Sequence, residues 1–407
     1  MEIIYERCCG LDIHKALIVA CFLGNGKKEI KTFGTSTDEL LNMCAWLKSR
    51  KVEKVAMEST GVFWKPIINI FELEDIPALL VNAQHVKNVP GRKTDVKDAE
   101  WIADLLKHGL LRASFVPNRD MRELRELCRY RTSIIEERAR ELNRLEKVLQ
   151  GANIKLTNVL SRVETQTGFE IVKALSEGVV NPDLLSMLAK GKAKAKADEL
   201  KIALKGLIQP HQQMMLKSML NHISNLDNTI ATLNLEIETR LAAENETVKL
   251  LDEITGVGIA SAQTIIAEIG TDMSQFPKAE NLASWAGLCP GNDESAGKRK
   301  SGKVRKGNPT LKKTLVQCGR SAANSKNTYL NSMYKRIAAR RGAKRATVAV
   351  AHAILIICFH MIKDKTHYKD LGADFYASIS KEAILKRSIL NIQKLGYFVT
   401  IQKNEIA

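Results

Sequence analysis

The sequence lacks any pair of cysteines at the Cys-x-x-Cys spacing that is typical of structural zinc sites and redox motifs. Eight cysteines are present all the same, and several of them lie within apolar runs. Such cysteines behave as small buried hydrophobic residues, so we expect neither a zinc site nor a disulfide framework. This usage is typical of a protein of the reducing cytoplasm.

Two features of exported and membrane proteins are missing as well. The N-terminal Met-Glu-Ile-Ile-Tyr-Glu-Arg does not have the charged and then apolar plan of a signal peptide. The long apolar run at residues 346–362 approaches the length of a membrane span, but it contains His352 and His360. We therefore expect a buried helix there, a cytoplasmic protein and no membrane partner.

Acidic residues are absent from residues 295–345, although this segment contains sixteen Lys and Arg. The whole chain has a formal net charge of +17 at pH 7, so the segment carries nearly all of the excess. A solvated surface usually mixes both signs, whereas a segment of one sign repels itself unless a polyanion lies against it. The segment therefore favours nucleic acid as a partner, and a merely solvated basic surface is the alternative.

The rest of the composition is that of a globular protein, and 407 residues allow two or three domains. The N-terminal patterns predict strands and helices in the order β-β-β-α-β-α-β-α. The expected strands are 8–12, 16–23, 28–33, 54–58 and 78–81, and the expected helices are 37–51, 62–73 and 94–106. This order predicts an α/β unit with a mixed sheet covered by helices, which by analogy is the arrangement of ribonuclease-H-like nucleases.

Four carboxylates stand at the ends of these elements. Asp12 ends the first strand and Glu58 the fourth, while Asp95 and Asp98 lie three apart on one side of a helix. If the first and fourth strands are neighbours, all four can converge at one end of the sheet. Their repulsion, several kcal/mol at an effective dielectric constant of about 20, would be reversed by a hard divalent cation. The pattern predicts bound Mg²⁺ or Mn²⁺; the alternative is helix-dipole and strand-end polar residues.

The middle of the chain is helical. Residues 119–150 carry an apolar stripe, and a later helix has apolar residues alternately three and four apart, the heptad rule of a coiled coil. The first stripe is Ile135, Ala139, Leu142, Leu145 and Leu149; the second is Leu216, Met219, Ile223, Leu226, Ile230, Leu233 and Ile237. We expect an antiparallel arm or an element that joins a dimer or tetramer. A helical core without a partner is the alternative.

The regions that flank the basic segment are helical too. Helical patterns on both sides of Gly256-Val-Gly258 have the shape of a helix-hairpin-helix, whose exposed amides suit a DNA phosphate. Further helices are expected within 311–325 and 330–362. Residues 190–196 are typical of a solvated helix or linker, and the tail from 372 has a helical piece and a strand-like run at 397–402.

Taken together, these motifs resemble the DEDD transposases of the IS110 insertion-sequence family over roughly residues 7–370. They occur in this order: Gly-Leu-Asp12-Ile-His-Lys, Met-Glu58-Ser-Thr-Gly, Lys-Thr-Asp95-Val-Lys-Asp98-Ala, Gly256-Val-Gly258 and Gly-Leu-Cys-Pro-Gly-Asn-Asp-Glu-Ser295-Ala-Gly-Lys. Ala296 stands where Gly is frequent in the family.

The resemblance implies a RuvC-like domain at 1–118, a coiled-coil region at 119–248, a mainly helical transposase domain at 249–371 and an extension at 372–407. It implies that Asp12, Glu58, Asp95 and Asp98 form the metal-binding tetrad and that Ser295 is the nucleophile that forms a phosphoserine link with DNA. It further implies guidance by a bridge RNA that pairs with donor and target DNA.

The basic segment then supplies cations that hold the backbone and offset charge on the phosphoryl oxygens. The residues expected to contact nucleic acid are Gly256, Gly258, Lys298, Arg299, Lys300, Lys303, Arg305, Lys306, Lys312 and Lys313. Two other functions stay open. One is a metal-dependent junction-resolving nuclease, in which water attacks the phosphate. The other is a DNA or RNA scaffold without catalysis.

Overall fold

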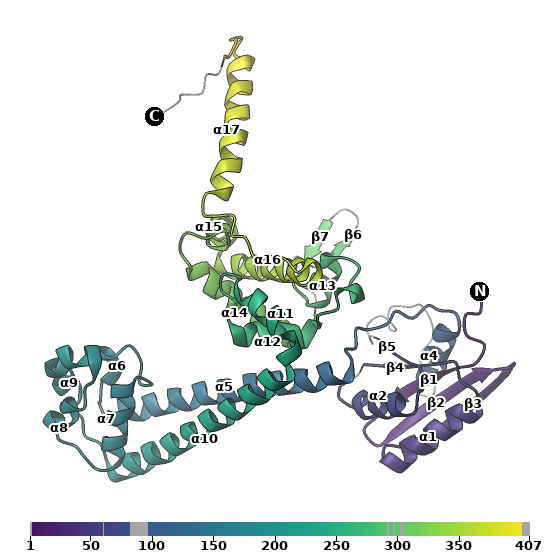
Figure 1. Cartoon of the computed structure of the whole chain (residues 1–407), viewed down its shortest axis with the longest axis horizontal. Coiled ribbons are helices and arrows are strands. Elements are labelled where there is room, and N and C mark those ends of the chain that lie inside the picture. Colours follow the sequence, from purple (N-terminus) through teal and green to yellow (C-terminus); the bar gives the residue numbers. More distant parts are fainter. Residues whose placement is uncertain are drawn as a thin grey trace. The chain divides into compact units, whose positions relative to one another are not determined.

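The computed structural model describes residues 2–59, 61–81, 97–290, 293–295, 298–301, 304 and 306–400. Asp95, Lys303 and Arg305, three of the predicted site residues, lie outside this part of the chain. The chain divides into two compact units, Met1–Arg119 and Asp120–Ala407. The first is purple to blue in Figure 1, and the second runs from blue to yellow.

Unit 1 is built on a five-stranded mixed sheet in the order β3-β2-β1-β4-β5. Its strands are β1 (Cys8–Ile13), β2 (Leu17–Gly24), β3 (Lys27–Gly34), β4 (Lys54–Glu58) and β5 (Ala78–Val81). β1, β2 and β3 form antiparallel hairpins, and the turn at Asn25-Gly26 has φ of 53° and 72°, as tight hairpins require. β1, β4 and β5 are parallel. The predicted mixed sheet is confirmed.

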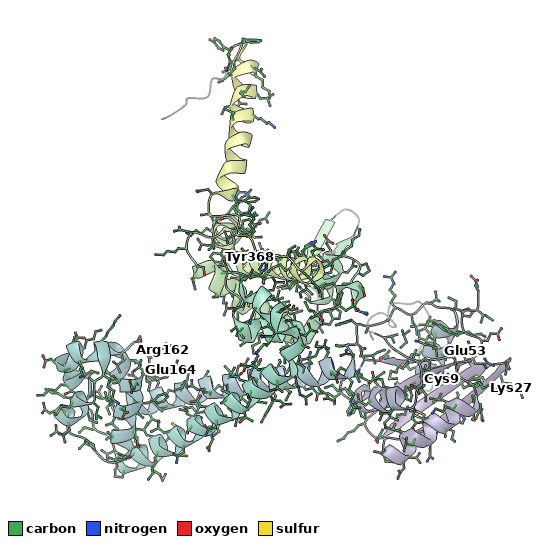
Figure 2. All side chains as sticks on the ribbon, viewed as in Figure 1. Cys9, Lys27, Glu53, Arg162, Glu164 and Tyr368 are labelled. Atoms are coloured by element: carbon green, nitrogen blue, oxygen red, sulfur yellow. The ribbon has the colours of Figure 1, made fainter. Side chains whose placement is uncertain are left out.

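Helices cover both faces of this sheet (Figure 1). They are α1 (Thr37–Ser49), α2 (Trp64–Leu73) and α4 (Lys97–Lys107). Side chains alternate between the faces along each strand, so Cys9 and Leu11 of β1 join the core beneath α1 and α2, and Figure 2 labels Cys9. Cys8 and Gly10 face α4 instead, and a Cβ on Gly10 would lie 2.2 Å from the Ala99 oxygen.

In unit 2, two long helices, α5 (Arg119–Gly151) and α10 (Pro210–Arg240), pack against each other in antiparallel directions. Polar pairs show the direction, because contacts early in α5 are made with residues late in α10. The pairs are Glu123–Arg240, Arg131–Asn234 and Arg138–Asp227. The predicted antiparallel arm therefore forms within one chain, and its part in joining two chains stays a prediction.

The predicted stripe is right for α10 and partly wrong for α5. On α10, Leu216, Ile223, Leu226, Leu233 and Ile237 are buried. On α5, Ile135 and Ala139 are exposed, and the buried row is instead Leu124, Cys128, Arg131, Ile134, Glu141, Leu145, Val148 and Leu149. The apolar pattern did not predict this buried row because the charged residues Arg131 and Glu141 occupy part of it.

The far ends of the arm are joined by a small helical lobe. It contains α6 (Leu156–Val159), α7 (Gln166–Ser176), α8 (Pro182–Met187), the 3₁₀ helix η1 (Gly191–Lys196) and α9 (Ala197–Ala203). An apolar core unites these helices with the ends of α5 and α10. Glu164, labelled in Figure 2, accepts from Arg138 of α5 at 3.3 Å and from Arg162 at 3.1 Å. The segment 190–196, expected to be a solvated helix or linker, contains η1, which buries no residue.

The rest of unit 2 is mainly helical and is centred on α16. The helices are η2 (Ala242–Glu244), α11 (Asn245–Asp252), α12 (Ile259–Ile269), η3 (Met273–Gln275), α13 (Ala279–Trp285), α14 (Pro309–Asn324), α15 (Tyr329–Arg341), α16 (Ala343–Asp364) and α17 (Phe375–Lys394). Residues 330–362 form two helices because Gly342 breaks them with a φ of 81°. Residues 397–400 of the expected strand-like run form no strand, and the rest of that run, 401–402, lies outside the described residues.

Within the described residues, α16 is the one helix long and apolar enough to cross a bilayer. One such helix is weak support for a membrane span, because the core helix of a globular domain has the same composition. α16 packs against α13, α14 and α15, and it buries residues along its length, including Val350, Ile354 and Cys358. The predicted buried helix is confirmed.

We expect Gly10→Ala to destabilise the protein by about 1–3 kcal/mol, because the new methyl group would meet the backbone of α4. Urea unfolding should show a lower midpoint at an unchanged slope. Gly151→Ala is the control, since its nearest neighbouring atom would be Gln212 Nε2 at 3.7 Å. In a helix that change should be neutral or stabilise by about 0.5–1 kcal/mol. Equal midpoints for both variants would contradict the close approach of α4.

Candidate active site

Asp12 and Glu58 lie side by side at the carboxyl ends of two neighbouring strands. β1 and β4 are parallel, and their register pairs Leu11 with Met57, so the next positions are Asp12 and Glu58. Adjacent strands lie about 4.8 Å apart, and residues at matching positions project from the same face. The condition for the carboxylates to converge, that the first and fourth strands are neighbours, is met.

The face that carries Asp12 is the face covered by α4. Cys8 donates from Sγ to the Ala103 oxygen at 3.5 Å, and Gly10 packs against Ala99. Because every second residue of a strand shares a face, Asp12 also projects to the α4 side.

Glu58 lies on the same face. Two residues earlier on β4, Ala56 packs with Ile102 and Leu106 of α4. The alternation of side chains along the strand then places Glu58 on the α4 side, where Glu58 is half-buried.

Asp98 belongs to the first turn of α4, and it is half-buried. The contacts run from Cys8 with Ala103 to Gly10 with Ala99, so α4 is antiparallel to β1 and begins near the carboxyl end of that strand. Asp98 precedes Ile102 by one turn and shares its sheet-facing side. Asp95, three residues earlier, falls outside the described residues.

Carboxylate oxygens are ligands that a hard divalent cation prefers, and Asp12, Glu58 and Asp98 lie on one face at one end of the sheet. Among the residues that the structure describes, no three Asp, Glu, His or Cys side chains are grouped closely enough to hold a metal ion. The predicted tetrad also includes Asp95, which lies outside the described residues, so this finding does not cover all four carboxylates.

His14 is a neighbour of Asp12 to which the sequence motif gave no role. Its Nε2 lies 3.0 Å from Asp12 Oδ2, and the imidazole is more than half exposed. The spacing of two residues at a strand end was the available signal, since it puts both side chains on one face. A hydrogen bond from the imidazole orients the carboxylate.

Ser295 ends a short strand in unit 2. It is the last residue of β6 (Asp293–Ser295), which pairs antiparallel with β7 (Lys298–Ser301). In the register of this hairpin Ser295 pairs with Lys298, and Glu294 pairs with Arg299. Below the hairpin, Pro290 and Val304 form a further antiparallel bridge. The strand register thus places Ser295 opposite a basic residue.

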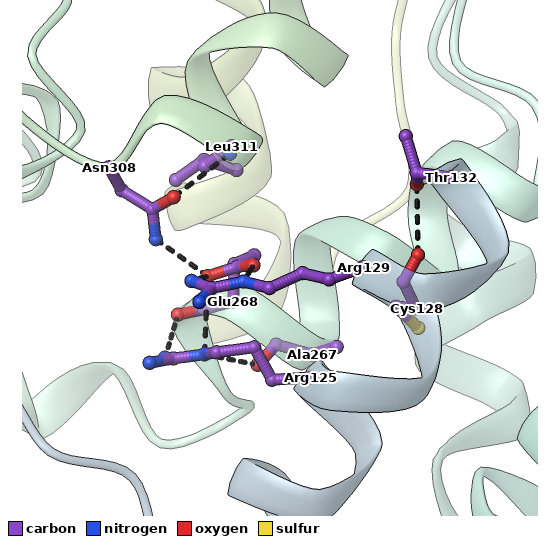
Figure 3. Close-up of polar contacts among 8 residues, drawn as sticks. All are labelled: Arg125, Cys128, Arg129, Thr132, Ala267, Glu268, Asn308 and Leu311. Carbon is purple, nitrogen blue, oxygen red and sulfur yellow. Dashed lines mark hydrogen bonds and ion pairs between the residues drawn. The ribbon is translucent and has the colours of Figure 1, made fainter. Parts of the chain in front are cut away.

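The chain that leaves the hairpin is tied to a buried carboxylate (Figure 3). Asn308 caps α14 by accepting from the Leu311 amide at 3.1 Å, and its Nδ2 donates to Glu268 Oε2 at 2.6 Å. Glu268 lies on α12 and is 0% exposed. Arg129 of α5 donates to both of its oxygens, from Nε at 2.7 Å and from Nη2 at 2.9 Å.

Arg125 completes this cluster from the preceding turn of α5. It donates to the backbone oxygens of Glu268 at 2.6 Å and Ala267 at 3.3 Å, and its Nε lies 3.2 Å from Glu268 Oε2 (Figure 3). Burial lowers the pKa of Arg125 to about 10, against the opposing effect of Glu268. The guanidinium is charged at neutral pH, and it also serves the last carbonyls of α12, where a cation is favourable.

The predicted basic contacts differ in their surroundings. Lys306 is exposed and Lys312 is half-buried, whereas Lys313 forms an ion pair with Glu136 of α5. Lys298, Arg299 and Lys300 are the first three residues of strand β7. Lys313 is therefore partly neutralised within the chain, which the sequence pattern did not indicate.

The two predicted glycines have different environments. Gly256 has a φ of 89°, and a Cβ there would lie 2.6 Å from the Cys318 oxygen, so this glycine lets the turn pack against α14. Gly258 is exposed at the N-terminus of α12, and a Cβ there would meet nothing within 4 Å. Of the two, Gly258 is the position open to a phosphate.

The Glu268 cluster was missed by the sequence analysis. A lone acid within the apolar run Thr-Ile-Ile-Ala-Glu-Ile-Gly was the available signal, because a carboxylate in a buried helix needs cationic partners. Arg125 and Arg129 stand in a heavily charged helix, where nothing in the pattern separates them from solvated arginines.

Comparison with known proteins identifies the chain. The family model of IS110-type DEDD transposases, described as a transposase, matches residues 9–154, and that of the IS116/IS110/IS902 transposase family matches residues 248–335. The transposase for insertion sequence element IS1111A from Coxiella burnetii is 24% identical over 370 residues, which cover 89% of this chain and 91% of that protein.

Two further relatives agree with these matches. An uncharacterized 42 kDa protein of insertion element IS900 from Mycobacterium paratuberculosis is 27% identical and covers 75% of this chain and 84% of its own. An uncharacterized 43.6 kDa protein of insertion element IS110 from Streptomyces coelicolor is 26% identical, over 69% of this chain and 73% of that protein. Since the two family matches together span more than half of its residues, the chain belongs to the IS110 family of insertion-sequence transposases, enzymes that act on DNA.

Proposed function

We propose that this transposase cuts and rejoins DNA strands through a phosphoserine intermediate at Ser295, with Mg²⁺ or Mn²⁺ held by Asp12, Glu58, Asp95 and Asp98. The observation that carries the proposal is the register of β1 and β4, which brings Asp12 and Glu58 together beneath the first turn of α4. The strand order and the helices on both faces support a RuvC-like, ribonuclease-H-like assignment of unit 1.

In this proposal the carboxylates of unit 1 bind the divalent cation and orient it toward the DNA phosphate. Asp12 and Glu58 project from the ends of paired strands, and the hydrogen bond with His14 orients Asp12. A cation held there would stabilise negative charge on phosphoryl oxygens and lower the pKa of a hydroxyl group bound to it. The half-buried positions of Glu58 and Asp98 limit their hydration, which strengthens their attraction to a cation.

Ser295 supplies the nucleophile. Its hydroxyl oxygen forms a bond to the phosphorus, the proton leaves to a base, and the bond from phosphorus to one DNA oxygen breaks so that this oxygen departs as a strand-end hydroxyl. A hydroxyl of another strand then attacks the same phosphorus and releases the serine. Lys298, paired with Ser295 in the hairpin, and Arg299, Lys303 and Arg305 offset charge on the phosphate.

The partners follow from the basic segment and the arm. Gly258 and the lysines and arginines of 298–313 would hold DNA and a bridge RNA that pairs with donor and target sequences. The arm of α5 and α10 would join protomers into a dimer or tetramer through its exposed surface. The domains would be 1–118, 119–248, 249–371 and 372–407.

We expect Ser295→Ala to abolish a covalent protein–DNA adduct, because alanine has no oxygen to bond to phosphorus. Purified protein is mixed with the flanking RNA of its element, Mg²⁺ and labelled junction DNA, and the products are run on a denaturing gel. Ser301→Ala is the control, since it removes a hydroxyl from the same hairpin. Cleaved DNA without an adduct, made equally well by Ser295→Ala, would instead establish a nuclease that uses water.

We expect Asp98→Asn to lower the affinity for Mn²⁺ by about 10- to 100-fold, because it removes a charged oxygen ligand. Adduct yield at a fixed metal concentration should fall with it. The control is Asp104→Asn, on the same helix, where the carboxylate is 51% exposed and pairs with His108 one turn on. Calorimetric titration with Mn²⁺ measures the affinity. Equal affinities for the two variants would show that Asp98 is not a metal ligand. If a variant with Asn or Gln at all four acidic positions were as active as wild type, a scaffold without catalysis would be favoured.

A further inference from the structure

Glu268 joins three segments of unit 2 that are far apart in the sequence. Its carboxylate receives Arg125 and Arg129 from α5 and Asn308 from the start of α14, while Glu268 itself belongs to α12 (Figure 3). A buried charge is tolerated only where it is paired and hydrogen-bonded. This cluster meets that need from two sides, with arm helix α5 on one and the N-cap of α14 on the other.

Asn308 uses both halves of its amide in this arrangement. Its oxygen accepts from the Leu311 amide, and its nitrogen donates to Glu268 Oε2. Aspartate would keep the first bond and lose the second, because a carboxylate has only acceptors. Serine or threonine would cap the helix with a shorter side chain. An amide at this position therefore ties the start of α14 to α12.

Few residues separate the hairpin from Asn308, and two of the described ones, Val304 and Gly307, make close backbone contacts. Val304 bridges Pro290, and the Asn308 amide donates to the Trp285 oxygen at 3.3 Å. Between them, Gly307 packs so closely that a Cβ would lie 2.3 Å from the Gly287 nitrogen. A displacement of Asn308 would therefore move the base of the hairpin.

We propose that Glu268 is a positioning residue that fixes the Ser295 hairpin, through Asn308, to arm helix α5. The catalytic part of this inference rests on the proposed role of Ser295 as the nucleophile. Glu268 does not itself touch DNA, since its side chain is fully buried. It sets where the hairpin stands, and a shift of about 1 Å in a reacting group costs up to about 100-fold in rate.

The decisive change is Asn308→Asp, which keeps the cap of α14 and turns the donor that faces Glu268 into a second carboxylate. The matched rescue is the double variant Glu268→Gln with Asn308→Asp. It restores one donor and one acceptor across the contact, but the amide nitrogen introduced at position 268 also faces Arg129 Nη2 and Arg125 Nε, which both approach Glu268 Oε2. The expected recovery is therefore partial. Asn181→Asp is the control, because Asn181 caps α8 through its side-chain oxygen at the Asp183 amide.

Hydrogen–deuterium exchange of the full-length variants, without DNA, measures the hairpin directly. We expect Asn308→Asp to raise exchange in peptides covering 293–301 by at least about tenfold, which corresponds to about 1.4 kcal/mol of local opening. The double variant should recover part of the lost protection, because it restores the contact with position 308 but removes an acceptor from the two arginines. Asn181→Asp should leave exchange at the wild-type rate. No rise in Asn308→Asp, or no recovery in the double variant, would overturn the proposal.

Adduct formation at saturating DNA provides the second readout. We expect a rate about 10- to 100-fold lower in Asn308→Asp, DNA affinity within about twofold of wild type, and partial recovery of the rate in the double variant. A parallel loss of DNA affinity would overturn positioning in favour of a general structural role. Absence of an adduct from the wild type would instead refute the serine mechanism, and the exchange experiment would still decide whether Glu268 fixes the hairpin.

Discussion

The close contact of α4 with β1 is the constraint on which unit 1 depends. Gly10 leaves no space for a side chain, so the backbone of α4 rests directly on the strand that ends in Asp12. The parallel register with β4 then brings Glu58 beside Asp12, and the antiparallel path of α4 brings Asp98 to the same end. The placement of three carboxylates thus follows from backbone packing, with His14 adding orientation to one of them.

The sheet and most helices were predictable from sequence because their periodicities are clean. β-like runs with short connections gave the hairpins, and the heptad of α10 matched its buried seam. The seam of α5 was not predictable from apolar residues, because Arg131 and Glu141 occupy it. Arg131 is 2% exposed and donates to Asn234 and Gln263, so the seam continues through hydrogen bonds.

The positions of Asp12, Glu58 and Asp98 at the ends of strands and a helix were predictable from sequence, while their role in binding a metal stays a proposal. The supporting residues were not, since a partner 40 positions away, such as Glu268 for Asn308, leaves no periodic trace. The pairing of Lys313 with Glu136 escaped for the same reason. Sequence patterns report the face on which a residue lies, and long-range polar contacts depend on how distant faces meet.

The antiparallel arm also limits how relatives of this chain can differ in length. α5 leads out to the helical lobe and α10 leads back, with side-chain pairs such as Arg138–Asp227 across the seam. An insertion of seven residues lengthens a helix by about 10.5 Å, and the seam stays matched only if both helices gain it. Arm length should therefore change in paired steps of one heptad, so that the lobe at its end moves outward in increments of about 10.5 Å.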